Sequence, residues 1–186
     1  MRQTWQGVLV SSQVDGAALA TSTTETSILP QQAKYTLPAN FLNDVGQTLR
    51  WRVMGRISTV VTTPGTLTFR IKFGATAVVV TPALALNVAA KTNVTWILEL
   101  DAVLRGAAGS AASLIHSGAW QSEAVIGSPA AGAGGAAAHI IPAVAPAVGA
   151  TFDSTAAQQV DLTAQWSVSS ASNSIQCHTY KLEAIN

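Results

Sequence analysis

The stretch from Gln47 to Thr81 alternates apolar and polar side chains with a period of two residues. This period is typical of β-strands that turn one face to a core and the other to water, whereas a helix repeats its apolar positions every three or four residues. Pro64-Gly65 and Gly74-Ala75 are turn-forming pairs that divide the stretch into three parts. We therefore predict a three-stranded antiparallel meander, with these residues facing the core: Leu49, Trp51, Val53, Leu67, Phe69, Ile71 and Phe73.

Later segments repeat the alternation. The last of them shifts phase between Cys177 and Tyr180, which indicates a β-bulge. No long stretch has a helical period, and turn residues recur at regular spacing, which favours a sandwich of short strands. The predicted later strands are Val94–Arg105, Ala112–Gln121, Val160–Val168 and Ile175–Ile185.

The first forty residues are less regular. Trp5–Val14 alternates loosely and is interpreted as a first strand or as part of an N-terminal arm over residues 1–20. The hydroxyl-rich segment Thr21–Ser27 suits an exposed edge strand. The segment Leu37–Leu42 predicts a short turn of α or 3-10 helix, which would place Leu37, Phe41 and Leu42 under the sheet.

Taken together, the 186 residues predict one all-β domain spanning 1–186. We expect an antiparallel β-sandwich of the jelly-roll type, with an immunoglobulin-like sandwich as the alternative.

Residues 128–150 form an unusual segment of alanine, glycine, proline, valine and isoleucine, with only Ser128 and His139 as polar side chains. Solvated loops carry more polar residues, and disordered segments combine low hydrophobicity with high charge. We therefore prefer an extended arm that lies on another surface to a disordered loop.

Charged residues make up only 10% of the chain, against about 25% in a typical soluble domain. The hydrophobic fraction is 48% and the mean hydropathy is +0.33. So few charges would do little to keep a monomer soluble. We infer that part of the outer surface is covered by copies of the chain or by a partner.

Several function classes find no support. A net charge of +1 speaks against nucleic-acid binding. The single cysteine, Cys177, cannot form an internal disulfide, and polar residues interrupt the N-terminal stretch too often for a secretory signal. No segment has the ~20 continuous apolar residues of a membrane helix, so we expect no membrane partner.

No catalytic, metal or cofactor motif stands out. His116, His139 and His178 have no metal-ligand spacing, and we expect His116 to pack near the core with a satisfied hydrogen bond. Cys177 and His178 are strand neighbours whose side chains point to opposite faces, so we do not expect a catalytic dyad there. We therefore expect no cofactor.

Glu99 and Asp101 are two residues apart on one strand, at a separation that could suit the two carboxyl groups of a glycosidase. Ion pairs across strands with the basic residues of the meander are the simpler explanation. Those residues are Arg50, Arg52, Arg70 and Lys72.

The five tryptophans invite a carbohydrate-binding interpretation, since aromatic rings stack on sugars. Trp51, Trp96 and Trp166 share phase with leucines and valines, so core packing explains them better. Trp5 and Trp120 are less determined.

Four short runs carry a resemblance to a known family: LPANFL (37–42), VGQTLR (45–50), PGTLT (64–68), and QWS (165–167) followed by NSI (173–175). From Ile28 to the end, the chain resembles virion structural proteins of tailed bacteriophages. The resemblance implies a jelly-roll decoration or cement protein that sits as a homotrimer on the outside of an icosahedral head. The segment 128–150 has no counterpart in that pattern.

The sequence-based hypothesis is thus a non-enzymatic capsid decoration protein. Its partners would be copies of itself and the major capsid protein, and it would be made in the host cytoplasm and located on the virion. A trimeric tail-fibre or receptor-binding head is the alternative, and a glycosidase is the third. The expected interface residues are Trp5, Ile140, Ile141, Val144 and Val148.

Overall fold

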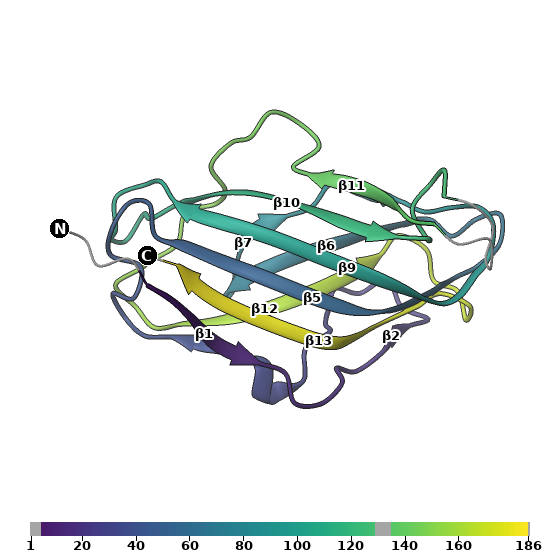
Figure 1. Cartoon of the computed structure of the whole chain (residues 1–186), viewed down its shortest axis with the longest axis horizontal. Helices are drawn as coiled ribbons and strands as arrows, with labels where there is room; N and C mark the ends of the chain where they lie inside the picture. Colours follow the sequence, from purple (N-terminus) through teal and green to yellow (C-terminus); the bar gives the residue numbers. More distant parts are fainter. Residues whose placement is uncertain (1–4, 129–134, 186) are drawn as a thin grey trace.

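The computed structural model describes residues 5–128 and 135–185, which fold into two antiparallel β-sheets packed face to face (Figure 1). Their helical content is one 3-10 turn, η1 (Gln31–Ala33). No helix among the described residues is long and apolar enough to cross a membrane.

The larger sheet has seven strands among the described residues, and six of them follow the order β1-β13-β5-β9-β10-β11, with β2 beside β13. All of its pairings are antiparallel. Its strands are β1 (Gln6–Ser11), β2 (Leu19–Ala20), β5 (Thr48–Thr59), β9 (Lys91–Leu104), β10 (Leu114–Ser122), β11 (Ala137–Ile141) and β13 (Ser174–Ile185).

The smaller sheet has six described strands, four of them in the order β3-β12-β6-β7, with β4 beside β12 and β8 beside β6. Its strands are β3 (Thr26–Ser27), β4 (Thr36–Leu37), β6 (Thr66–Phe73), β7 (Thr76–Val80), β8 (Leu84–Ala85) and β12 (Gln158–Trp166).

The pairing of the strands is nested, as in a long antiparallel hairpin rolled up on itself. The first strand, β1, pairs with the last, β13, and β3 pairs with β12. Further in, β5 pairs with β9, and β6 pairs with its neighbour β7. Successive pairs alternate between the two sheets, which is the jelly-roll arrangement and not the immunoglobulin-like one. The predicted fold class is confirmed, and β10 and β11 extend the larger sheet beyond this pattern.

The predicted meander over Gln47–Thr81 is wrong at its first turn. β6 and β7 form the expected hairpin, but β5 pairs with β13 and β9 in the other sheet. The connection through Pro64-Gly65, with Gly65 at a positive φ of 74°, carries the chain from one sheet to the other. An alternating pattern reveals which face of a strand is buried but not which strand lies beside it.

The faces of the strands were predicted correctly. The seven meander residues expected in the core are all at most 2% exposed. Phe69 of the smaller sheet packs against Trp96 and Trp120 of the larger sheet, at ring-centroid distances of 5.4 and 6.1 Å. These aromatic rings join the two sheets at the centre of the sandwich.

The four later strands were also predicted correctly, as β9, β10, β12 and β13. The bulge lies where the phase shift indicated it, because Cys177 pairs with Gly55, Thr179 pairs with Met54, and His178 between them has no opposite residue.

The N-terminal segment, where it is described, is a strand and not an arm. β1 pairs with β13, and the chain stays beside β13 through the backbone hydrogen bond from Gly16 N–H to the Cys177 carbonyl (2.8 Å). Residues 1–4 of the expected arm lie outside the described residues. Of Thr21–Ser27, only β3 pairs as an edge strand.

The short helical turn expected at Leu37–Leu42 is absent. Leu37 belongs to β4, and the chain then turns through Asn40, which has a positive φ of 60° and donates its N–H to the Ser154 carbonyl (2.8 Å). A left-handed residue bonded to another part of the chain cannot continue a helix. Leu37 and Leu42 are nevertheless buried, as expected.

Replacing Phe69 by alanine should lower the free energy of unfolding by about 3–5 kcal/mol, because it empties the contact between the sheets. Denaturant titration followed by tryptophan fluorescence measures this change. Val61→Ala, at a side chain that is 57% exposed, is the control and should cost less than about 0.5 kcal/mol. Equal losses in the two variants would contradict the central role of Phe69.

Candidate interaction surface

The unusual segment 128–150 enters the larger sheet and then leaves it. Within it, β11 pairs with β10 from Gly118↔Ile141 to Ser122↔Ala137. The expected arm on another surface is therefore wrong for β11, whose strand is part of the chain's own sheet. Residues 129–134 lie outside the described residues.

After β11 the chain forms a loop that projects beyond the edge of the sheet (Figure 1). We call residues 142–148 the apolar loop; its sequence is PAVAPAV. Val148 returns to bridge Ile115 of β10, and the next residue, Gly149, donates its N–H to the Leu114 carbonyl (2.8 Å). No side chain in the apolar loop can form a hydrogen bond, and all but Pro142 are exposed.

Four of the five expected interface residues are exposed to solvent. Ile140 is 72% exposed, Val144 77%, Val148 56% and Trp5 43%. Ile141 is only 1% exposed, because alternation along β11 turns it into the core when Ile140 faces out. Ile141 is therefore removed from the expected interface.

The structure brings three of these residues to one edge of the sandwich. Ile140 lies on β11, the outermost strand, and Val144 and Val148 belong to the loop that follows it. Trp5 precedes β1, which is the opposite edge of the same sheet. The exposed apolar side chains thus do not form one continuous patch.

An apolar groove of about 320 Å³ lies between the apolar loop and the edge strand of the smaller sheet. Sequence reasoning missed this groove because its walls come from three separate segments. The only available signal was the run of small apolar residues in β7. The groove is lined by Ala77, Val78, Val80, His116 and residues of the stretch 142–150.

His116 does not have the satisfied hydrogen bond that we expected. It lies opposite Ala102 on the inner face of β10, and both of its ring nitrogens are buried without a hydrogen-bond partner. Desolvation by burial lowers the pKa of the imidazole from its ordinary value. The groove therefore contains one polar group whose bonding capacity is unused.

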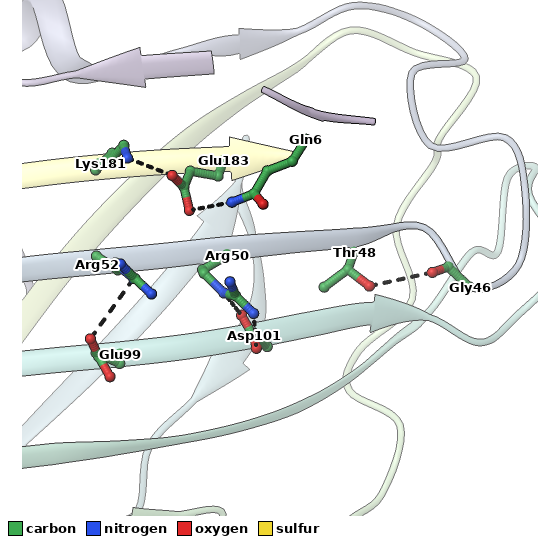
Figure 2. A network of polar contacts seen from close by, with 9 residues as sticks. All are labelled: Gln6, Gly46, Thr48, Arg50, Arg52, Glu99, Asp101, Lys181 and Glu183. Atoms are coloured by element: carbon green, nitrogen blue, oxygen red, sulfur yellow. Dashed lines mark hydrogen bonds and ion pairs between the residues drawn. The ribbon is translucent and has the colours of Figure 1, made fainter. Parts of the chain in front are cut away.

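The outer face of the larger sheet carries ion pairs instead (Figure 2). Arg50 lies directly opposite Asp101 and binds it through two hydrogen bonds of 2.7 and 3.0 Å. Arg52 lies opposite Glu99, at 3.9 Å. The hydrogen bonding that Arg50 donates to Asp101 is the main reason why the pKa of Arg50 is raised.

A second polar group on the same face joins β13 to β1. Lys181 contacts Glu183, which also accepts a hydrogen bond from Gln6 at 3.4 Å (Figure 2). The hydrogen bond from Lys181 is the main reason why the pKa of Glu183 is lowered. These contacts hold the edge strand β1 to its neighbour.

The ion pairs leave little capacity for acid–base chemistry. Both carboxylates of the candidate glycosidase pair, Glu99 and Asp101, face arginines, as the simpler explanation predicted. Arg70 and Lys72 pair elsewhere, with Glu25 at 3.7 and 3.3 Å. A depression of about 340 Å³ beside the ion pairs is lined by their side chains and by the small residues Ser117, Gly118 and Ala119.

Cys177 and the other two histidines form no dyad. Burial raises the pKa of the Cys177 thiol to about 12, and its Sγ donates to the Thr179 carbonyl at 3.4 Å. His178, the bulge residue, contacts Asp15 at 2.9 Å. The His139 ring stacks on Trp120, and its Nε2 lies 3.1 Å from the Ala85 carbonyl oxygen. Among the described residues, no three His, Cys, Asp or Glu side chains gather as a metal site would need.

No protein-family model matches the chain, and no curated protein matches its sequence.

The Arg50–Asp101 pair should contribute a coupling free energy of about 0.5–1 kcal/mol, because both side chains are about one-third exposed and solvent screens them. A double-mutant cycle with Arg50→Met and Asp101→Asn, followed by urea unfolding, measures it. The coupling should shrink in 1 M salt. A coupling free energy of zero at low salt would show that the contact between Arg50 and Asp101 does not stabilise the fold.

The Cys177 thiol should be unreactive in the folded protein, since it is buried and its pKa is far above neutral. Ellman's reagent at pH 8 should label less than about a tenth of it within minutes in buffer, and all of it in denaturant. Rapid labelling of the native chain would show that the Cys177 thiol is accessible and could act as a nucleophile.

Proposed function

We propose that the chain is a non-enzymatic capsid decoration protein of a tailed bacteriophage. It would bind as a homotrimer to the outside of the head and stabilise the lattice of the major capsid protein. The observation that carries this proposal is the apolar loop, an exposed and uncharged projection at one edge of a jelly-roll sandwich.

Contact through this loop is favoured by its composition. Burying an aliphatic side chain contributes about 1.5–3 kcal/mol, and Ile140, Val144 and Val148 are all more than half exposed. The neighbouring alanines and prolines add apolar area with little side-chain entropy to lose. The loop offers no hydrogen-bonding side chain that a partner would have to satisfy.

The distribution of charge also favours contact with a partner through the apolar loop. The ion pairs lie on the outer face of the larger sheet, whereas residues 142–152 contain no ionisable side chain. A protein that shows its charged face to water and its uncharged edge to a partner would remain soluble once assembled. Each contact would be modest. A symmetric trimer repeats the contact three times, and the lattice repeats it at many positions, so that the overall binding would be tight.

A trimeric receptor-binding head on a tail is the second candidate, and the polar depression beside the ion pairs is the observation that favours it. An aromatic platform for sugar rings is the weaker part of this interpretation. Trp51, Trp96, Trp120 and Trp166 are at most 1% exposed and belong to the core, and Trp5 lies at a distant edge. Specific signals on a glycan array, without binding to heads, would favour the second candidate.

Replacing Val144 by aspartate should weaken binding to phage heads at least tenfold, because it places a charge in a contact without partners for it. Binding is measured by co-sedimentation with heads that have been stripped of the chain. Val61→Asp is the matched control, since Val61 is also more than half exposed but lies outside the apolar loop.

Sedimentation equilibrium of the unaltered chain tests the other half of the proposal and should give the mass of a trimer. A stable monomer that does not bind heads would overturn the proposed function.

A further inference from the structure

The return of the apolar loop to the sandwich closes the gap between the two sheets. On one side, Gly149 donates its N–H to Leu114 of β10, and Phe152 donates to Ala112 at 2.9 Å. On the other side, the Gly149 backbone lies so close to β7 that a Cβ atom there would come within 2.4 Å of the Val78 carbonyl oxygen. Residues 148–152 therefore act as a clasp between β7 and β10.

His116 shares the groove with this clasp. Its side chain, which is half-buried, lines the groove together with Val148 and Gly149, and both ring nitrogens are buried without a hydrogen-bond partner. A neutral imidazole tolerates this position at the cost of unmade hydrogen bonds. An imidazolium does not, since a buried charge without a partner is far more costly than a buried neutral group.

Among residues 5–128 and 135–185, no charged side chain is placed to compensate a proton on His116. β7, the rest of β10 and residues 142–152 contain no Asp, Glu, Lys or Arg. On β9, the neighbouring strand, Ala102 faces His116, while the carboxylates point to the outer face and bind arginines. The other ionisable groups nearby have their own contacts: His139 with Ala85, Asp153 with Thr155, and Arg70 and Lys72 with Glu25.

We propose that His116 and the clasp over residues 148–152 form a proton-sensitive latch, which is closed at neutral pH and opens when His116 takes up a proton. Opening gives the imidazolium access to water and frees the apolar loop from β7 and β10. The consequence for head binding rests on the function proposed above, whereas the latch itself is a property of the isolated chain.

The direction of the pH effect follows from burial. In the closed latch the pKa of His116 lies below the ordinary value of 6.5, which it regains when the latch is open. The closed state is therefore fully favoured above pH 6.5, and its advantage is lost as the pH falls from 6.5 through the lowered pKa. Within that window the opening constant should rise by up to about tenfold per pH unit.

Hydrogen exchange of the full chain, followed by NMR and corrected for intrinsic rates, tests the latch. The amides of Gly149 and Phe152 should lose protection as the pH falls from 7.5 to 5, while the Trp96 amide in the central strand β9 keeps its protection. In His116→Leu this pH dependence should disappear. His178→Asn is the control, because it removes a histidine that contacts Asp15 and does not line the groove. This variant should retain the pH dependence.

Protection that stays constant down to pH 5, or that still falls in His116→Leu, would overturn the latch. If His116→Leu does not fold, an NMR titration of the histidine ring protons in the unaltered chain decides. A midpoint for His116 below 6.5 that coincides with the loss of protection at Gly149 and Phe152 supports the latch, and a midpoint at or above 6.5, or one without that loss, overturns it.

Co-sedimentation with heads at pH 7.5 and 5.5 separates the two proposals. Loss of protection in a chain that binds heads at neither pH leaves the latch standing and overturns the decoration function. Binding to heads together with constant protection supports the decoration function and overturns the latch.

Discussion

The contact between Phe69 of one sheet and Trp96 and Trp120 of the other is the interaction on which the rest of this molecule depends. A jelly roll has no helix to cover its sheets, so each sheet must bury its inner face against the other. With only 10% of its residues charged, the chain has few ion pairs to add to that burial. Large aromatic side chains at the centre pack with leucines, isoleucines and valines of both sheets to form a continuous core.

The edge strands of the two sheets are protected by their geometry and not by charged side chains. Proteins usually guard edge strands with lysines or prolines, or by bending them. Here β3 has two residues, and β1 is interrupted by a bulge between Val8 and Val10. β7 is bulged after Ile71 of its partner and is approached by Gly149. β11 has five residues and is followed at once by Pro142. Geometry replaces charge at these edges.

The sequence predicted which residues face inward but not how the strands are arranged. Alternation in β5, β6, β9 and β12 depends on local burial, and so it could be read without knowing any neighbour. The separation of β5 from β6 depends on where β13 and β9 lie, and these strands are distant in the sequence. The bulge at His178 was visible because a bulge changes the phase of the pattern within its own strand.

The candidate site was less predictable, for a related reason. The exposure of Val144 and Val148 could be expected from an apolar segment without polar neighbours. The burial of Ile141 could not, since it requires the partner strand β10. His116 was expected to find a hydrogen bond, as buried polar groups generally do. Its failure to find one depends on three walls of small apolar residues that meet only in the folded chain.

The protected sheet edges and the contacts at Gly149 make the apolar loop suited to specific docking, beyond what its low polarity alone would give. A fold that blunts its sheet edges by geometry is protected against indiscriminate strand pairing. It can therefore present aliphatic side chains on a projection beside an edge strand as short as β11. The projection is also tied to both sheets at Gly149, through a hydrogen bond on one side and close backbone contact on the other. A loop held in this way loses less conformational entropy when it docks than a free one would, which favours specific contact over general adhesion.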